Sequence, residues 1–402
     1  MKRCLFYLSD KCIYFAILIL FTKQKGENMT KITRRDWLIG STALIGGAAL
    51  ATNAHAQSIT IEGYVPTPEN PIRMSSNENP YGVNKKASTA MCKAHKYGHL
   101  YGGGGAQGPL TELIAGMEKV PTENVMVAGG SGEILKTLAL MVAMEGGKIL
   151  APMPTYDDTF MDYSNQRGIE KIWVPVAEDL SIDLDAIKAA YTDDVRIIYL
   201  CNPNNPIPTV MHAEKLKEFC KEMSQKCYVF VDEAYFEYVN DPNYETMIPL
   251  VTEYPNVVVT RTASKIHAFA GIRIGFGFGS PDMLAKIKSL MTGSINGPAM
   301  WGAIESYKDT DYQQFVLRKN REALQVLYDF FDKHGMRHIK SNANFTFFET
   351  GMDSVEVNKR IRQHGIAIGR PFPPFLDWMR ISTARPEDMK FFTEIYEKEF
   401  FS

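Results

Sequence analysis

The chain has 402 residues, of which 45% are hydrophobic and 22% are charged, and its formal net charge at pH 7 is -2. A chain of this length and composition can bury a large core and is expected to form two domains. The small net charge and the absence of long lysine and arginine runs in its body argue against a nucleic-acid partner. The six cysteines show no Cys-x-x-Cys spacing, so we expect no metal site, while disulfides among the four beyond residue 56 stay open.

Residues 1–56 are expected to be a leader that is not part of the fold. The pair Arg34-Arg35 precedes an apolar run rich in small residues, and Ala-His-Ala at 54–56 has the form of a signal-peptidase site. The pattern resembles a twin-arginine export signal and predicts cleavage after Ala56. It therefore implies a periplasmic protein that the twin-arginine translocase exports in folded form.

A transmembrane anchor is the alternative interpretation of this leader. The apolar run at 37–52 contains three glycines and is short for a span of about 20 residues, so we expect no stable membrane anchor. A second apolar run within residues 1–28 is also too short to span comfortably. Because the export signal is complete from Met29 onward, Met29 is an alternative start of the chain.

Between residues 124 and 278, apolar strands alternate with helical segments, which predicts an α/β fold with helices on a mostly parallel seven-stranded sheet. The strands are expected at 124–128, 148–151, 171–176, 196–201, 228–232, 257–260 and 272–278. The helices between them are expected at 133–144, 184–191 and 214–223.

Beyond residue 298 the pattern changes to long helices and short strands. The helices are expected at 312–334 and 355–364, and the strands at 344–348 and 378–382. This predicts a smaller α+β domain over 298–402, a large domain over 105–297, and an N-terminal arm over 57–104 that joins the small domain.

The most informative segment surrounds Lys265. It follows the β-branched run at 256–260, which is typical of a buried strand, so we expect Lys265 on the connection that leaves the sheet. A lysine whose pKa is lowered by its surroundings can form a Schiff base with an aldehyde, and the planar fork of Arg273 suits a phosphate. An aldehyde that carries a phosphate suggests pyridoxal 5'-phosphate as the cofactor. The alternative is a solvated lysine in a loop.

Other strand ends carry groups that fit the same cofactor. The glycine-rich turn at 129–132 joins a strand to a helix, so its N–H groups and the positive helix end form an anion cradle. A carboxylate at Asp232 would keep a pyridine nitrogen protonated. Tyr235 and Asn205 can bond the ring hydroxyl, and Tyr156 offers the ring a flat face. The alternatives are a turn that needs glycine only for its geometry, a capping aspartate and tyrosines packed in the core.

Together these motifs resemble the fold-type I pyridoxal-phosphate aminotransferases of class I/II, and histidinol-phosphate aminotransferases in particular. The resemblance is carried, in the family's order, by residues 77–82, 130–133, 154–156, 202–206, 232–235, 262–265, Arg273 and 379–382. It spans nearly the whole chain beyond the leader and is highly specific for fold and cofactor.

The resemblance also implies roles for individual residues. Lys265, Asp232, Tyr235 and Asn205 would be catalytic, with Lys265 as the Schiff-base lysine and proton shuttle. Cofactor contacts would further come from Ser131, Gly132, Glu133, Tyr156, Thr262, Ser264 and Arg273. Substrate contacts would come from Arg380, which would bind the α-carboxylate, and from Tyr81 and Arg370. In the family's dimer a tyrosine reaches the phosphate of the neighbouring subunit, and Tyr101 is its best match, so a homodimer is implied.

Two segments depart from the family's pattern. The usual Asn-Pro-Thr-Gly becomes Asn-Pro-Ile-Pro at 205–208, where Pro208 fixes φ and removes a backbone donor. The family's substrate-phosphate arginine, in Gly-Ile-x-x-Arg, has no match in register, because Gly369 stands at its position and Arg370 follows one residue later. This shift, like the export signal, argues against histidinol phosphate as the substrate. The loop at 370–378 is expected either to line the substrate site or to form a packed turn.

The resulting hypothesis is a periplasmic transaminase that moves an amino group from an amino acid, or a histidinol-phosphate-like amine, to a 2-oxo acid. Because the first oxo acid is released before the acceptor reverses the sequence, ping-pong kinetics follow. A lyase, decarboxylase or cyclase on the same fold is the nearest alternative, since substrate orientation decides which bond is broken. A catalytically silent binding protein is the alternative from a different class.

Overall fold

The computed structural model describes residues 65–402. The predicted leader, with its arginine pair, the cleavage after Ala56 and the alternative start at Met29, lies outside these residues. Within 65–402, none of the helices combines the length and the apolar character that crossing a membrane requires. Residues 65–402 all belong to one compact unit, and the domain boundaries expected after residues 104 and 297 stay predictions.

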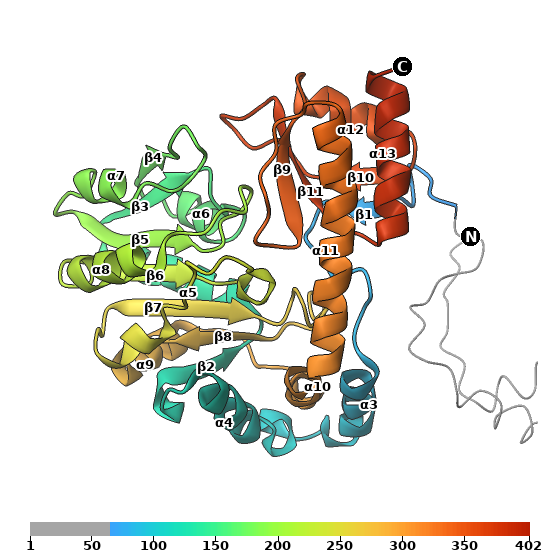
Figure 1. The fold of residues 1–402 in the computed structure, drawn as a ribbon. Coiled ribbons are helices and arrows are strands. Elements are labelled where there is room, and N and C mark those ends of the chain that lie inside the picture. The colour runs from blue at the N-terminus through green and yellow to red at the C-terminus, as the bar shows by residue number, and fades with distance from the viewer. Residues whose placement is uncertain (1–64) are drawn as a thin grey trace, which may run out of the picture. The chain divides into compact units, whose positions relative to one another are not determined.

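A seven-stranded sheet, formed by strands between Val125 and Phe278, is the largest sheet of the described residues (Figure 1). Its strand order is β2-β8-β7-β6-β5-β3-β4. The bounds are β2 (Val125–Ala128), β3 (Lys148–Met153), β4 (Lys171–Pro175), β5 (Val195–Cys201), β6 (Tyr228–Asp232), β7 (Val257–Thr262) and β8 (Gly275–Phe278). Only β8 runs antiparallel to its neighbours, β2 and β7, and the other pairs are parallel. The predicted α/β class and mostly parallel sheet are confirmed.

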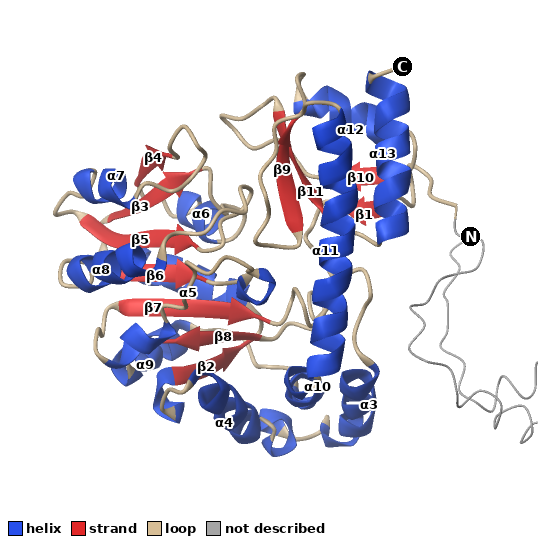
Figure 2. Cartoon of the chain, in the orientation of Figure 1, coloured by secondary structure: helices blue, strands red, loops and turns tan. Residues whose placement is uncertain are grey.

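Helices cover both faces of this sheet (Figure 2), and the strands are apolar for that reason. In β5, Ile198 and Leu200 belong to one hydrophobic cluster and the alternate residues Ile197 and Tyr199 to another. The first cluster includes side chains of α4 (Gln107–Glu118), α7 (Leu184–Ala189), α8 (Ala213–Met223) and α10 (Gly297–Lys308). The second includes side chains of α5 (Ser131–Glu145), α6 (Phe160–Asn165) and α9 (Pro281–Leu290).

The strand expected at 272–278 is shorter than predicted. Arg273 has a φ of 68°, in the left-handed region, so the extended backbone begins only at Gly275. Such a conformation is rare for a residue with a side chain and costs about 1–3 kcal/mol, which the surrounding structure must offset. It turns the Arg273 side chain toward the start of α5, where the candidate site lies.

A second group of elements packs around two small sheets. β1 (Ile72–Met74) pairs in parallel with β10 (Ile366–Ile368), and β9 (Phe345–Glu349) pairs antiparallel with β11 (Trp378–Ser382). The helices here are α11 (Thr310–Lys333), α12 (Ser354–Arg362) and α13 (Pro386–Phe400), whose apolar faces meet these strands in one cluster. α11 runs from α10 up to the small sheets in Figure 1. Because β1 belongs to the N-terminal arm, the arm contributes directly to this region.

The remaining elements are short helices in the connections. α3 (Lys85–Ala94) packs on α10. The 3-10 turns are η2 (His95–Tyr97), η3 (Tyr101–Gly105), η4 (Thr122–Asn124), η5 (Phe236–Tyr238) and η6 (Ile248–Thr252).

Candidate active site

A cavity of about 180 Å³ lies where the carboxyl ends of β5, β6 and β7 meet the start of α5. This is the edge at which parallel sheets bind their ligands. The lining residues are Ser131, Gly132, Leu135, Tyr156, Thr159, Cys201, Asp232, Ala234, Tyr235, Thr262, Ser264, Lys265, Ala270 and Arg273. A larger hollow of about 860 Å³ beside α7 and α8 contains none of the predicted site residues, so the chemistry points to the smaller cavity.

Lys265 lies in the turn after β7, with its side chain half-buried and facing this cavity. Burial and the positive charge of Arg380 lower the pKa of Lys265 to about 8, although the carboxylate of Asp232 acts in the opposite direction. The Nζ atom is 5.2 Å from the centre of the Tyr235 ring. An amine with this pKa is neutral often enough near neutral pH to act as a nucleophile or base.

Asp232 ends β6 at the floor of the cavity. Its Oδ1 accepts a hydrogen bond of 3.0 Å from Thr260 Oγ1. Burial raises the pKa of Asp232 to about 6, against the opposing effects of that bond and of Lys265. A cation placed beside it would favour the ionised carboxylate, so this environment fits a protonated ring nitrogen.

The phosphate end of the cavity combines a helix N-terminus with an arginine. Gly130, with a φ of 89°, precedes α5, and a Cβ there would collide with the Arg273 guanidinium. Arg273 Nη1 donates to Ser264 Oγ at 3.4 Å, and Thr262 Oγ1 donates to Ser264 Oγ at 2.9 Å. No ion pair between Arg273 and a carboxylate occurs within residues 65–402. The positive charge of Arg273 and the dipole of α5 thus converge at one end of the cavity, as a phosphate site requires.

Hydrogen bonds connect the ring-binding candidates to Arg380. The buried hydroxyl of Tyr235 accepts from Asn77 Nδ2 at 2.9 Å and from Asn205 Nδ2 at 3.2 Å. Arg380 Nη1 donates to Asn205 Oδ1 at 2.7 Å, so Asn205 links the tyrosine to the arginine. Since both lone pairs of the Tyr235 oxygen accept amide donors, its own O–H stays available for a ligand. On the other side, Tyr156 shares a hydrogen bond of 2.7 Å with Thr159.

Arg380, on β11, is 7% exposed. Its Nη2 donates to the carbonyl of Ser75, and its guanidinium lies 5.1 Å from the centre of the Phe372 ring. Its Nε has no hydrogen-bond partner, and among the described residues no carboxylate forms an ion pair with it. Burial therefore lowers the pKa of Arg380, and the group is left ready for an external anion.

Two predicted contacts lie away from the cavity. The ring of Tyr81 packs edge-on against Phe315, 5.0 Å away, in a cluster with Tyr238 and Ile266, so the structure does not place it among the substrate contacts. The carboxylate of Glu133 accepts from Gly129 N at 2.7 Å and stabilises the turn, so its side chain does not face the cofactor cavity.

Two other predicted contacts, Arg370 and Tyr101, do not line this cavity. Arg370 Nη2 pairs with Asp158 at 2.8 Å and also with Asp157, just beyond Tyr156. These carboxylates occupy its guanidinium, so it is not a free anion site. Tyr101, at the start of η3, is fully exposed and does not line the cavity of its own chain.

The structure also adds residues that the sequence did not single out. Asn77, Thr159, Cys201 and Thr260 all contact the site or its catalytic side chains. Asn77 lies in a recognised motif, but its contact with Tyr235 bridges distant segments. Cys201 is a buried free thiol at the end of β5, and burial raises its pKa well above the usual range. Cys92, Cys220 and Cys227 are also free.

Comparison with known proteins agrees with this geometry. The family model of aminotransferase class I and II matches residues 69–391, so the chain belongs to this family. It is similar to the histidinol-phosphate aminotransferase of Brevibacillus brevis, with 32% identity over 304 residues, which cover 74% of this chain and 81% of that protein. The protein is therefore a pyridoxal-phosphate-dependent aminotransferase, as predicted, and resembles histidinol-phosphate aminotransferases.

Two solved structures share the fold. The histidinol-phosphate aminotransferase of Sinorhizobium meliloti, in complex with pyridoxal 5'-phosphate, aligns with a TM-score of 0.74 and 23% identity over 87% of this chain and all of that one. The L-threonine-O-3-phosphate decarboxylase of Porphyromonas gingivalis aligns with a TM-score of 0.70 and 17% identity over 82% of this chain and all of that one. At such identities the likeness concerns the fold, which is the type I fold of pyridoxal-phosphate enzymes.

Proposed function

We propose that this aminotransferase takes the amino group of an unphosphorylated α-amino acid and passes it to a 2-oxo acid, with Arg380 binding the α-carboxylate. The observation that carries the proposal is the burial of Arg380 without a carboxylate partner in the described chain. A buried guanidinium is unfavourable unless an anion compensates it, and a carboxylate matches its planar fork. Asn205, which bonds both Arg380 and Tyr235, places this anion beside the ring-binding side chains.

Different residues of the chain would bind different groups of the cofactor. Bound pyridoxal phosphate supplies an aldehyde and a ring that stabilises negative charge at the substrate α-carbon. Arg273 and the start of α5 would hold its phosphate, and Asp232 would keep its ring nitrogen protonated. Tyr235 would donate its free O–H to the ring hydroxyl oxygen.

Lys265 moves the proton that transamination requires. With a pKa of about 8, its neutral Nζ can take the proton from the substrate α-carbon and deliver it to the carbon that the cofactor aldehyde would supply, on the other side of the amino nitrogen. By fixing the carboxylate, Arg380 would orient the α-carbon hydrogen toward Lys265. Orientation by Arg380 thus favours proton removal over loss of the carboxylate.

The substrate class follows from the segment that precedes β11. A Cβ at Gly369 would lie 2.5 Å from the backbone oxygen of Arg380, so this position cannot hold a larger side chain without a shift. The neighbouring Arg370 is occupied by Asp157 and Asp158. A second anion on the substrate that approached Arg370 would meet its two carboxylate partners. These contacts favour amino acids with neutral side chains.

Histidinol phosphate is the second candidate, and the names of the similar relatives favour it. The two candidates differ in their dependence on Arg380. Arg380→Ala should lower kcat/KM for α-amino acids by about 10-fold to 150-fold, because a hydrogen bond between charged groups contributes about 1.5–3 kcal/mol. We expect neutral amino acids to be better donors than histidinol phosphate, and Asp157→Asn with Asp158→Asn to raise kcat/KM for the phosphorylated amine. A wild-type enzyme that prefers histidinol phosphate would contradict the proposal.

We further propose a homodimer in which Tyr101 reaches the cofactor phosphate of the neighbouring subunit. Tyr101 is fully exposed and the adjacent Leu100 is 48% exposed, although such side chains are usually part-buried. The turn that presents them is fixed, since Trp301 Nε1 donates to Gly103 O at 3.1 Å. An exposed aromatic side chain on a fixed turn is typical of an interface.

Export to the periplasm by the twin-arginine route is also proposed, on the strength of Arg34, Arg35 and the Ala-His-Ala site at 54–56. Cell fractionation should find the chain in the periplasm with Gln57 at its N-terminus. Arg34→Lys with Arg35→Lys should retain it in the cytoplasm. An uncleaved chain that stays in the cytoplasm in wild-type cells would contradict export.

A further inference from the structure

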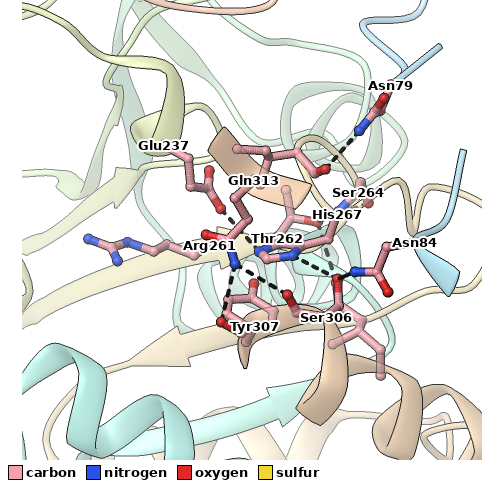
Figure 3. A network of polar contacts seen from close by, with 12 residues as sticks. Asn79, Asn84, Glu237, Arg261, Thr262, Ser264, His267, Ser306, Tyr307 and Gln313 are labelled. Carbon is pink, nitrogen blue, oxygen red and sulfur yellow. Dashed lines mark hydrogen bonds and ion pairs between the residues drawn. The ribbon is translucent and has the colours of Figure 1, made fainter. Parts of the chain in front are cut away.

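A buried carboxyl group lies directly behind the two catalytic segments. Glu237 is in η5, two residues after Tyr235, and His267 is two residues after Lys265 (Figure 3). Glu237 Oε1 and His267 Nε2 are 3.7 Å apart, and the two side chains are only 9% and 1% exposed. Within residues 65–402 neither oxygen of Glu237 has a hydrogen-bond partner, and the histidine nitrogen lies 3.7 Å from Oε1.

The other side of His267 is held by α10. Its Nδ1 shares a hydrogen bond of 2.9 Å with Ser306 Oγ, which also accepts from Asn84 Nδ2 at 3.3 Å. The imidazole stacks on Tyr307 with 3.9 Å between ring centres. Figure 3 shows this row of contacts running from Glu237 through His267 to Ser306. The imidazole therefore cannot turn away from Glu237 without breaking its packing on α10.

The charges around Glu237 do not compensate an ionised carboxylate. Arg261 is the nearest cation, but it binds Glu233 at 3.0 Å and also pairs with Glu118, so two carboxylates already neutralise it. Burial lowers the pKa of His267 to about 3, which leaves the imidazole neutral. The titratable groups that face Glu237 are Arg261 from β7 with its partners Glu118 and Glu233, Tyr238 from η5, Tyr244 and Tyr307.

We propose that Glu237 is a positioning residue that stays protonated, directs its proton toward His267 Nε2 across their 3.7 Å contact, and thereby ties the Tyr235 segment to the turn that carries Lys265. In this arrangement His267 Nδ1–H donates to Ser306 Oγ, so one row of neutral polar contacts runs from η5 to α10. The proposal rests on the pyridoxal-phosphate chemistry at Lys265 but not on the identity of the amino donor.

The proposal implies a pH limit. Burial raises the pKa of Glu237 to about 8, well above that of an ordinary carboxyl group. The stabilising effect of the neutral form is complete below the ordinary carboxyl pKa and is lost as the pH rises through about 8. Above that pH, an uncompensated negative charge would replace the donor, and the Lys265 turn would lose its tether.

Glu237→Gln and Glu237→Ala separate positioning from simple packing. Gln keeps the shape and a neutral donor, so its variant should retain activity while its thermal midpoint falls less than that of the wild type between pH 6 and pH 9. Ala removes the donor and should lower kcat by about 10-fold to 100-fold with little change in KM, because misplacing the lysine affects the chemical step after binding. The same pH difference should persist in a Lys265→Ala background, which excludes titration of Lys265 as its cause.

Infrared spectra of the cofactor-free chain provide a readout that does not depend on activity. The wild type should show a protonated-carboxyl band near neutral pH that is absent in Glu237→Gln. Identical spectra and parallel pH curves for the two proteins would show that Glu237 is ionised and would overturn the proposal. Full kcat in Glu237→Ala would overturn its positioning role, whichever amino donor the enzyme uses.

Discussion

At the level of single residues, the reactivity of Lys265 depends on its surroundings more than on its own chemistry. Burial and the like charge of Arg380 both favour the neutral amine, whereas Asp232 opposes them. The same arginine that is proposed to bind the substrate therefore also tunes the lysine. Binding of a carboxylate would neutralise Arg380 and change the field at Lys265 at the moment when the reaction begins.

This coupling can be measured in the cofactor-free chain. Arg380→Met should raise the pKa of Lys265 above 8, because it removes a nearby positive charge. The rate at which the chain reacts with pyridoxal phosphate should then rise with pH at higher values than in the wild type. Arg370→Met is the matched control, since Asp157 and Asp158 already neutralise that arginine. Unchanged profiles in both variants would show that Lys265 does not sense Arg380.

At the level of elements, the phosphate end of the site depends on close contact between β8 and the start of α5. A Cβ at Gly275 would collide with the backbone of Gly130 and Ser131. Gly275→Ala should therefore lower the stability by about 1–3 kcal/mol and weaken pyridoxal-phosphate binding, because overpacking pushes the helix start outward. Gly271→Ala, where the added Cβ meets no atom within 4 Å, is the control.

Thermal unfolding and cofactor titration of both glycine variants test this contact. The control should behave like the wild type. Equal cofactor affinity in Gly275→Ala and Gly271→Ala would mean that the helix start does not need this close approach.

The strands of the large sheet could be predicted because each is a short apolar run with turn residues at its end. β5, β6 and β7 are buried on both faces, which makes this signal strong. Helices α4 and α10 gave a weaker signal, since Gly108, Pro109 and Gly116 interrupt one, and Gly297, Pro298 and Gly302 the other. Their packing on the core determines them more than their local preferences do.

The site residues also divide into those that the sequence predicts and those that it does not. Side chains at strand ends, such as Asp232 and Lys265, follow from the topology, because parallel strands bring their ends to one edge. Asn77 could not be placed in this way, because its backbone N–H donates to Ser382, 305 positions away. The direction of the Tyr81 side chain could not be predicted either, because its motif does not determine it, and the ring packs on Phe315.

At the level of the whole molecule, each active site of the proposed dimer contains residues of both subunits, because Tyr101 comes from the neighbouring one. Lys265→Ala should abolish activity, and Tyr101→Ala should weaken cofactor retention in every site of its own homodimer. When the two variants are mixed in equal amounts and allowed to exchange, each hybrid dimer should regain one intact site of its two, which by random pairing is about one site in four over the whole mixture. Activity at limiting cofactor should therefore rise on mixing.

Light scattering provides the control for this experiment. A monomeric protein, or a mixture no more active than its components, would exclude a contribution of Tyr101 across an interface.

The central claim is that the site moves an amino group and does not eliminate, decarboxylate or only bind its ligand. The most direct test is a single turnover of the cofactor-loaded enzyme with an amino acid and no acceptor, followed by visible absorption and product analysis. We expect the cofactor to become pyridoxamine phosphate with release of one 2-oxo acid per site, and to return on addition of a second 2-oxo acid. Release of carbon dioxide or ammonia with the cofactor unchanged would contradict the account.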